Sequence, residues 1–315
     1  MEMKASTLIN HLQIAVRYRE SLSLNTNAMR LVNSRRDSLE GLIIDRYNTH
    51  FVVYLLDNFW RQHKEAIRDF LCEHFDVQYL ISKDRNVAPI SVDVLIKHED
   101  SETVVEENGL HFYVDLNDHL NQGLFLDMRR NRKLVASYAK DKAVLNCFAY
   151  TCSFGVYCRK FGASRVTNVD ISSKALKKGQ KNYQLNHLHV GRSEFVQDHA
   201  VKYMQRVAKR NNLFDIIILD PPSFSRYQGE VFSVKKDMPF MIEKALEALT
   251  ASGILFISTN LSSISRLRME EWVHAAAKKV RRKVTEVNHL GQDVEFRGSG
   301  LMKESFLSAL LVKIQ

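Results

Sequence analysis

The feature that most limits how this chain can fold is an apolar segment, residues 216–219, followed directly by Asp220-Pro221-Pro222-Ser223-Phe224. Branched apolar side chains without an alternating polar face are typical of a strand buried on both faces of a parallel sheet. Two successive prolines fix the backbone and leave carbonyl groups as acceptors beside an aromatic ring. Ligands of α/β proteins bind at the carboxyl ends of such strands, so we expect a functional site here. The alternative is an ordinary proline turn.

Apolar segments alternate with helical segments from about residue 131 onward. The expected strands are residues 144–148, 166–171, 194–196, 216–219, 254–258 and 307–312. Such alternation predicts an α/β, Rossmann-like fold with a mostly parallel sheet covered by helices on both faces. We assign this fold to residues 121–315.

A smaller α+β domain is expected in residues 1–120, where strands and helices do not alternate regularly. We predict a helix at 7–21, a hairpin formed by 41–47 and 51–56, a helix at 60–75, and strands at 77–82 and 110–116.

The first strand-to-helix turn of the larger domain, residues 149–154, suits a cofactor without phosphate groups. It contains no glycine before Gly155, whereas a dinucleotide requires a Gly-x-Gly-x-x-Gly turn for its pyrophosphate. S-adenosylmethionine carries no phosphate and tolerates a bulkier turn. The cofactor-binding residues expected here are Asn146, Phe148, Tyr150, Ser153 and Gly155.

Two acidic residues follow the next strands. Asp170 ends the second predicted strand, 24 residues after Asn146, a spacing that places a carboxylate beside a ribose, with Ile171 next to it. The alternative is that Asp170 caps the helix beginning at Ser172 or Ser173. Asp198 follows the third strand and is expected to accept from an adenine amino group.

Taken in order, these motifs resemble those of class I S-adenosylmethionine-dependent methyltransferases. Residues 123–132, 146–151 and 220–224, with 41–47 upstream, are similar to bacterial large-subunit ribosomal RNA methyltransferases that make 5-methylcytosine or 7-methylguanine. The similarity covers roughly residues 30 to 315, and it implies that residues 1–120 form an RNA-binding or linking domain. It implies a mixed, mostly parallel seven-stranded sheet, S-adenosylmethionine as methyl donor and ribosomal RNA as partner. The separate amino-terminal RNA-binding domain of many cytosine-modifying relatives is expected to be missing.

The resemblance also implies roles for the segment before the first parallel strand. Phe125, Asp127, Arg129 and Arg132 would lie on the segment that closes over the methionine end of the cofactor. An Asp and an Arg can pair with the ammonium and carboxylate of that group. The alternative is a basic helix start that contacts RNA phosphates, and Arg130 is assigned to the substrate on this basis. Cys152 replaces the usual glycine of these families.

The acceptor atom is predicted from the strand at 254–257. Methylation of cytosine C5 requires a thiolate that adds to the ring, but Ser258-Thr259-Asn260 occupies the corresponding position. Guanine N7 has a lone pair and needs only positioning, so we favour it. Asp220, Pro221, Pro222 and Phe224 form the expected catalytic turn, with Phe224, Ser258 and Asn260 contacting the base. The alternatives are 5-methylcytosine formation, methylation of a protein amide or small molecule, and an RNA-binding protein without turnover.

Composition adds expectations about partners and compartment. The chain has 45 Lys and Arg residues against 36 acidic residues, a net charge of +9 that favours nucleic acid. Three basic clusters, at 129–133, 174–181 and 278–283, are expected around one site, although each alone is typical of a solvated helix face. The four cysteines lack metal-binding spacing, so we expect neither zinc nor disulfides. Without a membrane-length apolar segment or secretory signal, we predict a cytoplasmic protein; the oligomeric state is unknown.

Overall fold

The computed structural model describes residues 5–118, 121–227, 230–297 and 307–315. The chain forms two compact units. The first contains Met1–Arg129 and Asp293–Glu304, and the second contains Arg130–Gln292 and Ser305–Gln315. The first unit therefore includes residues 121–129, beyond the boundary predicted at residue 120, and a segment from near the end of the chain.

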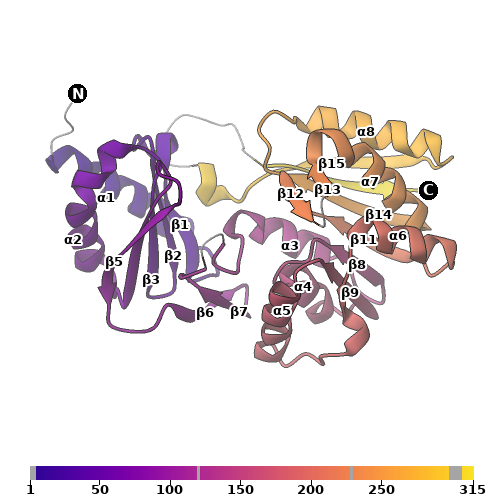
Figure 1. Ribbon diagram of the computed structural model, residues 1–315, viewed down its shortest axis with the longest axis horizontal. Helices are drawn as coiled ribbons and strands as arrows, with labels where there is room; N and C mark the ends of the chain where they lie inside the picture. Colours follow the sequence, from indigo (N-terminus) through magenta and orange to yellow (C-terminus); the bar gives the residue numbers. More distant parts are fainter. Residues whose placement is uncertain (1–4, 119–120, 228–229, 298–306) are drawn as a thin grey trace. The chain divides into compact units, whose positions relative to one another are not determined.

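The first unit is built on a five-stranded sheet with the order β1-β2-β3-β4-β5 (Figure 1). Its strands are β1 (Ala28–Asn33), β2 (Leu42–Tyr47), β3 (His50–Leu55), β4 (Tyr79–Asp84) and β5 (Ser91–Lys97). β3 and β4 pair in parallel and the other neighbours are antiparallel. The predicted hairpin at 41–56 is thus confirmed as β2 and β3.

Helices cover one face of this sheet. The helices α1 (Ala5–Ser21) and α2 (Lys64–His74) and the 3-10 helix η2 (Asn58–His63) contribute to a core with alternate residues of β2 and β3. The shorter elements are η1 (Ser34–Asp37), the hairpin strands β6 (Glu102–Glu107) and β7 (Leu110–Asp115), η3 (Leu126–Met128) and η5 (Val294–Arg297).

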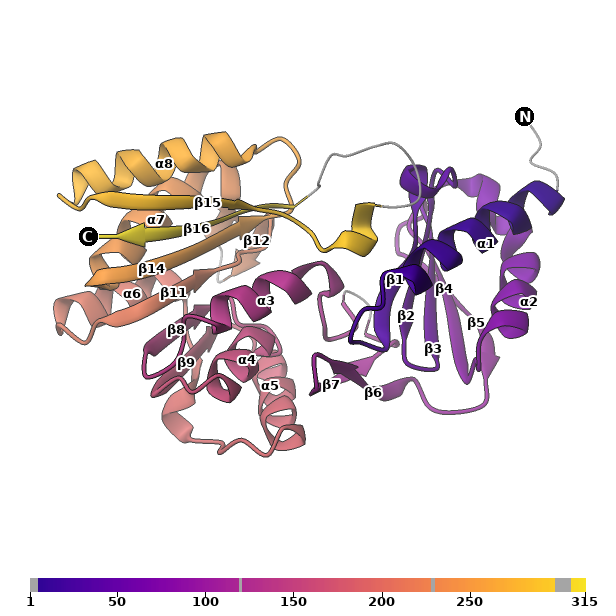
Figure 2. The same cartoon turned by 180° about the vertical axis from the view of Figure 1, so that it is seen from behind.

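The second unit contains a seven-stranded sheet with the order β10-β9-β8-β11-β14-β16-β15 (Figures 1 and 2). The strands are β8 (Ala143–Cys147), β9 (Arg165–Asp170), β10 (Phe195–Gln197), β11 (Phe214–Leu219), β14 (Leu249–Thr259), β15 (Val284–Leu290) and β16 (Ser308–Ile314). Only β16 runs antiparallel to the others in this sheet. The predicted mostly parallel sheet is confirmed.

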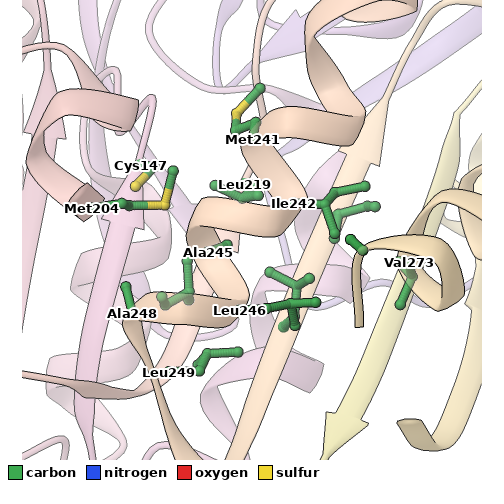
Figure 3. Packing of buried hydrophobic residues seen from close by; sticks show 14 of the residues in the cluster. Cys147, Met204, Leu219, Met241, Ile242, Ala245, Leu246, Ala248, Leu249 and Val273 are labelled. Atoms are coloured by element: carbon green, nitrogen blue, oxygen red, sulfur yellow. The ribbon is translucent and has the colours of Figure 1, made fainter. Parts of the chain in front are cut away.

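Helices cover both faces of the second sheet. They are α3 (Arg129–Ala136), α4 (Ser153–Lys160), α5 (Ser173–Leu185), α6 (Ala200–Lys209), α7 (Val234–Ala248) and α8 (Arg266–Lys279). The short helix η4 (Arg192–Glu194) precedes β10. A separate hairpin pairs β12 (Phe224–Tyr227) with β13 (Glu230–Ser233). Figure 3 shows α7 side chains such as Ile242 and Leu246 packed with Leu219 of β11 and Val273 of α8. This core fixes the strand ends that carry the candidate site.

Candidate active site

The polar residues predicted to form the site follow strands that end at one edge of the second sheet, called the carboxyl edge below. The parallel register pairs Leu219 with both Cys147 and Ile257, and Gln197 with Asp170. Because these strands end level with one another, the turns after β8, β9, β10, β11 and β14 lie at the same edge. The sequence therefore located this edge correctly.

The turn after β8 has an unusual backbone. Phe148, Tyr150 and Cys152 have φ angles of 56°, 47° and 60°, so three alternate non-glycine residues are left-handed. Each such residue costs about 1–2 kcal/mol and is kept only where the surroundings impose it. The left-handed angle at Cys152 explains why a glycine suits this position.

Hydrogen bonds hold this strained turn in place. The Tyr150 amide donates to Oδ2 of Asp170 at 2.8 Å, and Nδ2 of Asn182 donates to the Thr151 carbonyl at 2.9 Å. The amide of Cys152 donates to the carbonyl of Ala149 at 2.7 Å. The turn is thus formed by contacts within the second unit, before any ligand binds.

Asp170 connects the turn to the following helix. Its Oδ1 accepts from the Ser172 amide at 2.8 Å while Oδ2 accepts from Tyr150. Ser172 itself is the N-cap of α5, and its side chain accepts from the Ala175 amide, so the alternative that Asp170 caps this helix is wrong. Burial raises the pKa of Asp170, although backbone amides act in the opposite direction. Each carboxylate oxygen keeps capacity for a further bond, as a ribose requires.

A buried polar network lies behind the turn. Nδ2 of Asn146 donates to Oδ1 of Asn168 at 2.9 Å, and Nδ2 of Asn168 donates to the hydroxyl of Tyr183 at 3.0 Å. A Cβ atom on Gly155 would lie 2.3 Å from Oδ1 of Asn168, so α4 can approach β9 closely only with glycine there. The sequence analysis did not single out Asn168 and Tyr183. A polar residue inside an apolar strand, two positions before Asp170, was the available signal.

Asp198 lies directly after β10 and beside the backbone of Asp170. Its amide donates to the Asp170 carbonyl at 3.1 Å, and its carboxylate forms an ion pair with Arg206 of α6. Arg206 was not predicted, because eight residues separate the pair and only the fold brings them together. An adenine amino group at Asp198 would share the carboxylate with Arg206. The Ile171 carbonyl accepts from Gln197 at 3.2 Å.

Two hydrogen bonds join the Asp-Pro-Pro turn to the end of β14. Oγ of Ser258 donates to Oδ1 of Asp220 at 2.6 Å, and Oγ of Ser223 donates to Oδ1 of Asn260 at 2.5 Å. The sequence predicted both segments as one site, and the structure brings them together. Phe224, which follows Ser223, is 56% exposed.

The segment expected to close over the cofactor is divided between the units. Phe125, Asp127 and Arg129 belong to the first unit, and Arg130 and Arg132 to the second. Arg132 is buried, with its guanidinium 6.0 Å from the centre of the Tyr157 ring, and Arg130 is exposed. The proposed contacts of these residues with cofactor or RNA stay predictions.

Arg129 has structural contacts inside the first unit. Its Nε donates to Asp293 at 2.9 Å, its Nη1 donates to the Ala28 carbonyl at 3.2 Å, and its Nη2 pairs with Glu295. The side chain is only 4% exposed. These contacts explain its burial without a cofactor, and its cofactor role stays a prediction.

The buried cysteines are unsuited to nucleophilic attack. Cys147, Cys152 and Cys158 are fully buried free thiols in the second unit. Burial raises the pKa of all three, that of Cys158 to about 12, so the reactive thiolate is strongly disfavoured. The fourth cysteine, Cys72, lies in α2 of the first unit and is exposed.

One basic cluster is not where the sequence analysis expected it. Arg282 donates to the carbonyls of Leu246, Leu249, Thr250 and Ala251, at the beginning of β14 rather than at the carboxyl edge. Lys279 pairs with Glu243 of α7. The expectation that residues 278–283 surround the site is therefore wrong. Periodicity identified a basic helix end but could not show which edge of the sheet that end reaches.

Within the described ranges, no three His, Cys, Asp or Glu side chains gather as metal ligands. No helix among these residues is both long and apolar enough to cross a bilayer.

The strand order, with one antiparallel strand placed next to the end, and the acid that ends β9 define the second unit as a class I S-adenosylmethionine-dependent methyltransferase domain. The half-buried carboxylate of Asp170 and the turn without a phosphate-binding glycine pattern fit that cofactor. The family described as S-adenosylmethionine-dependent methyltransferase matches residues 74–296, and the chain belongs to it. The protein is thus an enzyme with S-adenosylmethionine as methyl donor.

Individual relatives are similar over most of the chain. Ribosomal RNA large subunit methyltransferase I of Tolumonas auensis is 33% identical over 257 residues, which cover 78% of this chain and 65% of the relative. The protein of the same name from Photobacterium profundum is 30% identical over 284 residues, covering 88% and 72%. The crystal structure of SMU.776 complexed with SAH has a TM-score of 0.88 at 28% identity, covering 99% of this chain and 82% of the other.

Proposed function

We propose that this enzyme methylates a base of large-subunit ribosomal RNA, with N7 of a guanine as the acceptor. Two relatives that match most of this chain at 30–33% identity are named ribosomal RNA large subunit methyltransferase I, and this name supports the substrate class. The net charge of +9 agrees with a polyanionic partner. The residues of the site support the choice of acceptor atom.

The observation that carries the choice of acceptor is the hydrogen bond between Ser258 and Asp220. Near the end of β14, a hydroxyl and not a thiol contacts Asp220, the acid that follows β11. The three thiols of the second unit are buried, with raised pKa values. Cytosine C5 cannot be methylated without a nucleophile that adds to the ring, whereas guanine N7 carries its own lone pair.

The residues at the edge support positioning of a base. The exposed Phe224 offers a ring on which an unstacked base can lie, a contact worth about 1–3 kcal/mol. Because Asn260 receives the Ser223 hydroxyl at its Oδ1, its amide nitrogen is left to donate to an acceptor such as guanine O6. Asp220 is held by Ser258, and the carbonyls of Pro221 and Pro222 remain acceptors for N–H groups of the base.

The bound cofactor supplies an electrophilic methyl group on a sulfonium. Asp170 would hold the ribose of the cofactor, Asp198 its adenine, and the left-handed turn would lie beneath it. The N7 lone pair forms the new bond as the methyl–sulfur bond breaks. The guanine gains the positive charge that the sulfur loses, so the reaction requires no base to remove a proton. Catalysis then consists of orientation, for which a preformed edge is suited.

The test is methylation of ribosomal RNA from a strain without the gene, followed by mass spectrometry of the nucleosides. We expect 7-methylguanosine, formed by wild type and by each Cys→Ser variant at positions 72, 147, 152 and 158. Phe224→Ala should lower turnover by about 5- to 150-fold if stacking is lost. A 5-methylcytosine product, loss of all turnover in a Cys→Ser variant that still binds cofactor, or methyl transfer only to protein or small molecules would overturn the proposal.

A further inference from the structure

The face of the first unit's sheet opposite α1 and α2 carries an unusual set of buried polar side chains. Alternate residues of β3 point to the helices, so Tyr54 points to the other face, and its register partner on β4 is Lys83. Both residues are buried, at 5% and 2% exposure. A lysine this deeply buried requires an explanation, because its ammonium loses its hydration.

The Lys83 ammonium has few partners in the protein. Its Nζ donates to the Asp118 carbonyl at 2.7 Å, which uses one of three N–H groups, and no ion pair with an acid is formed among the described residues. Burial lowers the pKa of Lys83 to about 8, with Arg85 acting in the same direction and Asp118 and Asp115 opposing it. The group is still mainly charged at pH 7.

A second buried donor is joined to Tyr54, the register partner of Lys83. The Tyr54 hydroxyl donates to Oε1 of Gln122 at 2.7 Å, which fixes the amide. Nε2 of Gln122 then has no hydrogen-bond partner in the described part of the chain, although Gln122 is only 5% exposed. The exposed guanidinium of Arg85 lies 4.5 Å from the centre of the Tyr54 ring, so the cluster reaches the surface of the unit.

We propose that Lys83 and Gln122 form a binding site for an anionic oxygen group, with Arg85 at its entrance. Buried N–H groups left without an acceptor are rare in folded proteins, and an oxyanion would accept from Nε2 of Gln122 and from a remaining N–H of Lys83. On the proposed function, from which this inference follows, the group is a phosphate of the RNA substrate. The cofactor carboxylate is the other source of the same chemistry, and the experiment separates the two.

The variants are Lys83→Met and Gln122→Glu, with Lys97→Gln as a matched control. Lys83→Met keeps an unbranched side chain, one atom shorter, and removes a buried charge, so folding should be preserved. Gln122→Glu keeps the acceptor for Tyr54 and replaces the free donor by an oxygen. Lys97 is an exposed lysine on β5 of the same sheet. Thermal unfolding checks that each variant folds, and Lys83→Arg tests whether charge restores binding.

Filter binding of ribosomal RNA across a salt series and calorimetric titration with S-adenosylmethionine are measured separately. We expect Lys83→Met and Gln122→Glu to weaken RNA binding by about 10- to 100-fold. Lys83→Met should also reduce the slope of log affinity against log salt by about 0.7. Cofactor affinity and the Lys97→Gln control should stay unchanged.

A loss confined to cofactor affinity would assign the oxyanion to the cofactor and overturn the RNA phosphate. Unchanged binding of both ligands in the folded variants would overturn the site itself. Because binding is measured without turnover, either result is distinguishable from failure of the proposed function, in which wild-type enzyme would not methylate ribosomal RNA.

Discussion

The carboxylate of Asp170 holds the strained turn, and we propose that it also accepts from the ribose of the cofactor. Its two oxygens already receive the amides of Tyr150 and Ser172. We expect Asp170→Ala to weaken S-adenosylmethionine binding by about 1.5–3 kcal/mol, the typical worth of hydrogen bonds to a charged group. Calorimetric titration measures this, with Glu271→Ala, an exposed acid on α8, as control. An unchanged dissociation constant would make Asp170 purely structural.

The raised pKa of Asp170 gives the same prediction a pH dependence. Cofactor binding requires the carboxylate, so affinity should fall on acidification, beginning at a pH above 3.8, the ordinary value. Stability changes in the opposite sense. The burial penalty is fully present above the raised pKa and is lost as pH falls towards 3.8, because the folded protein then binds the proton. Asp170→Asn should remove both trends, and a pH-independent affinity in wild type would contradict the assignment.

At the level of elements, α5 packs against the turn through a glycine. A Cβ atom on Gly179 would lie 2.4 Å from Sγ of Cys152. We expect Gly179→Ala to destabilise the second unit by about 1–3 kcal/mol through overpacking, and Cys152→Gly in the same chain to recover part of the loss. Urea unfolding of the four proteins in this double-mutant cycle measures the coupling. Gly191→Ala, where the nearest neighbour is 3.5 Å away, is the control. Additive effects would contradict this packing.

How far the sequence predicted the elements depended on the range of the interactions. The apolar runs before Asp170 and Asp220 located strand ends, because burial and the acid or prolines that follow are local signals. The left-handed angles of the turn escaped prediction, since contacts from distant residues such as Asn182 impose them. The basic cluster at 278–283 was placed at the wrong edge of the sheet for a related reason. The charge of a helix end does not show which edge of the sheet that end reaches.

For the whole molecule, the first unit depends on residues from both ends of the chain. Arg129 pairs with Asp293 and Glu295, and the carbonyl of Phe296 accepts from Asn33 and Arg36. No sequence pattern indicated that this late segment contributes to the first unit, because Arg129 and Asp293 are 164 residues apart. The two-domain division was inferred from the change to alternating strands and helices near residue 131. Such a change cannot reveal that a late segment belongs to the first unit.

We expect Arg129→Ala to destabilise the first unit by about 3–5 kcal/mol, because it leaves buried carboxylates unpaired. The chain has two tryptophans, Trp60 in the first unit and Trp272 in the second. In a Trp272→Phe background, Trp60 fluorescence during urea unfolding reports the first unit alone. Arg130→Ala, at the exposed neighbouring position, should have little effect. Equal unfolding midpoints for the two variants would show that the buried pairs do not stabilise the unit.

The separation of Arg129 from its acidic partners also sets the order of events during synthesis. A ribosome that adds 5–20 residues each second needs roughly 8 to 30 s to proceed from Arg129 to Asp293. Throughout that interval the guanidinium of Arg129 lacks its acidic partners, because Asp293 and Glu295 have not yet been translated. The five-stranded sheet can form first, yet the first unit is complete only after nearly every strand of the larger sheet has been translated.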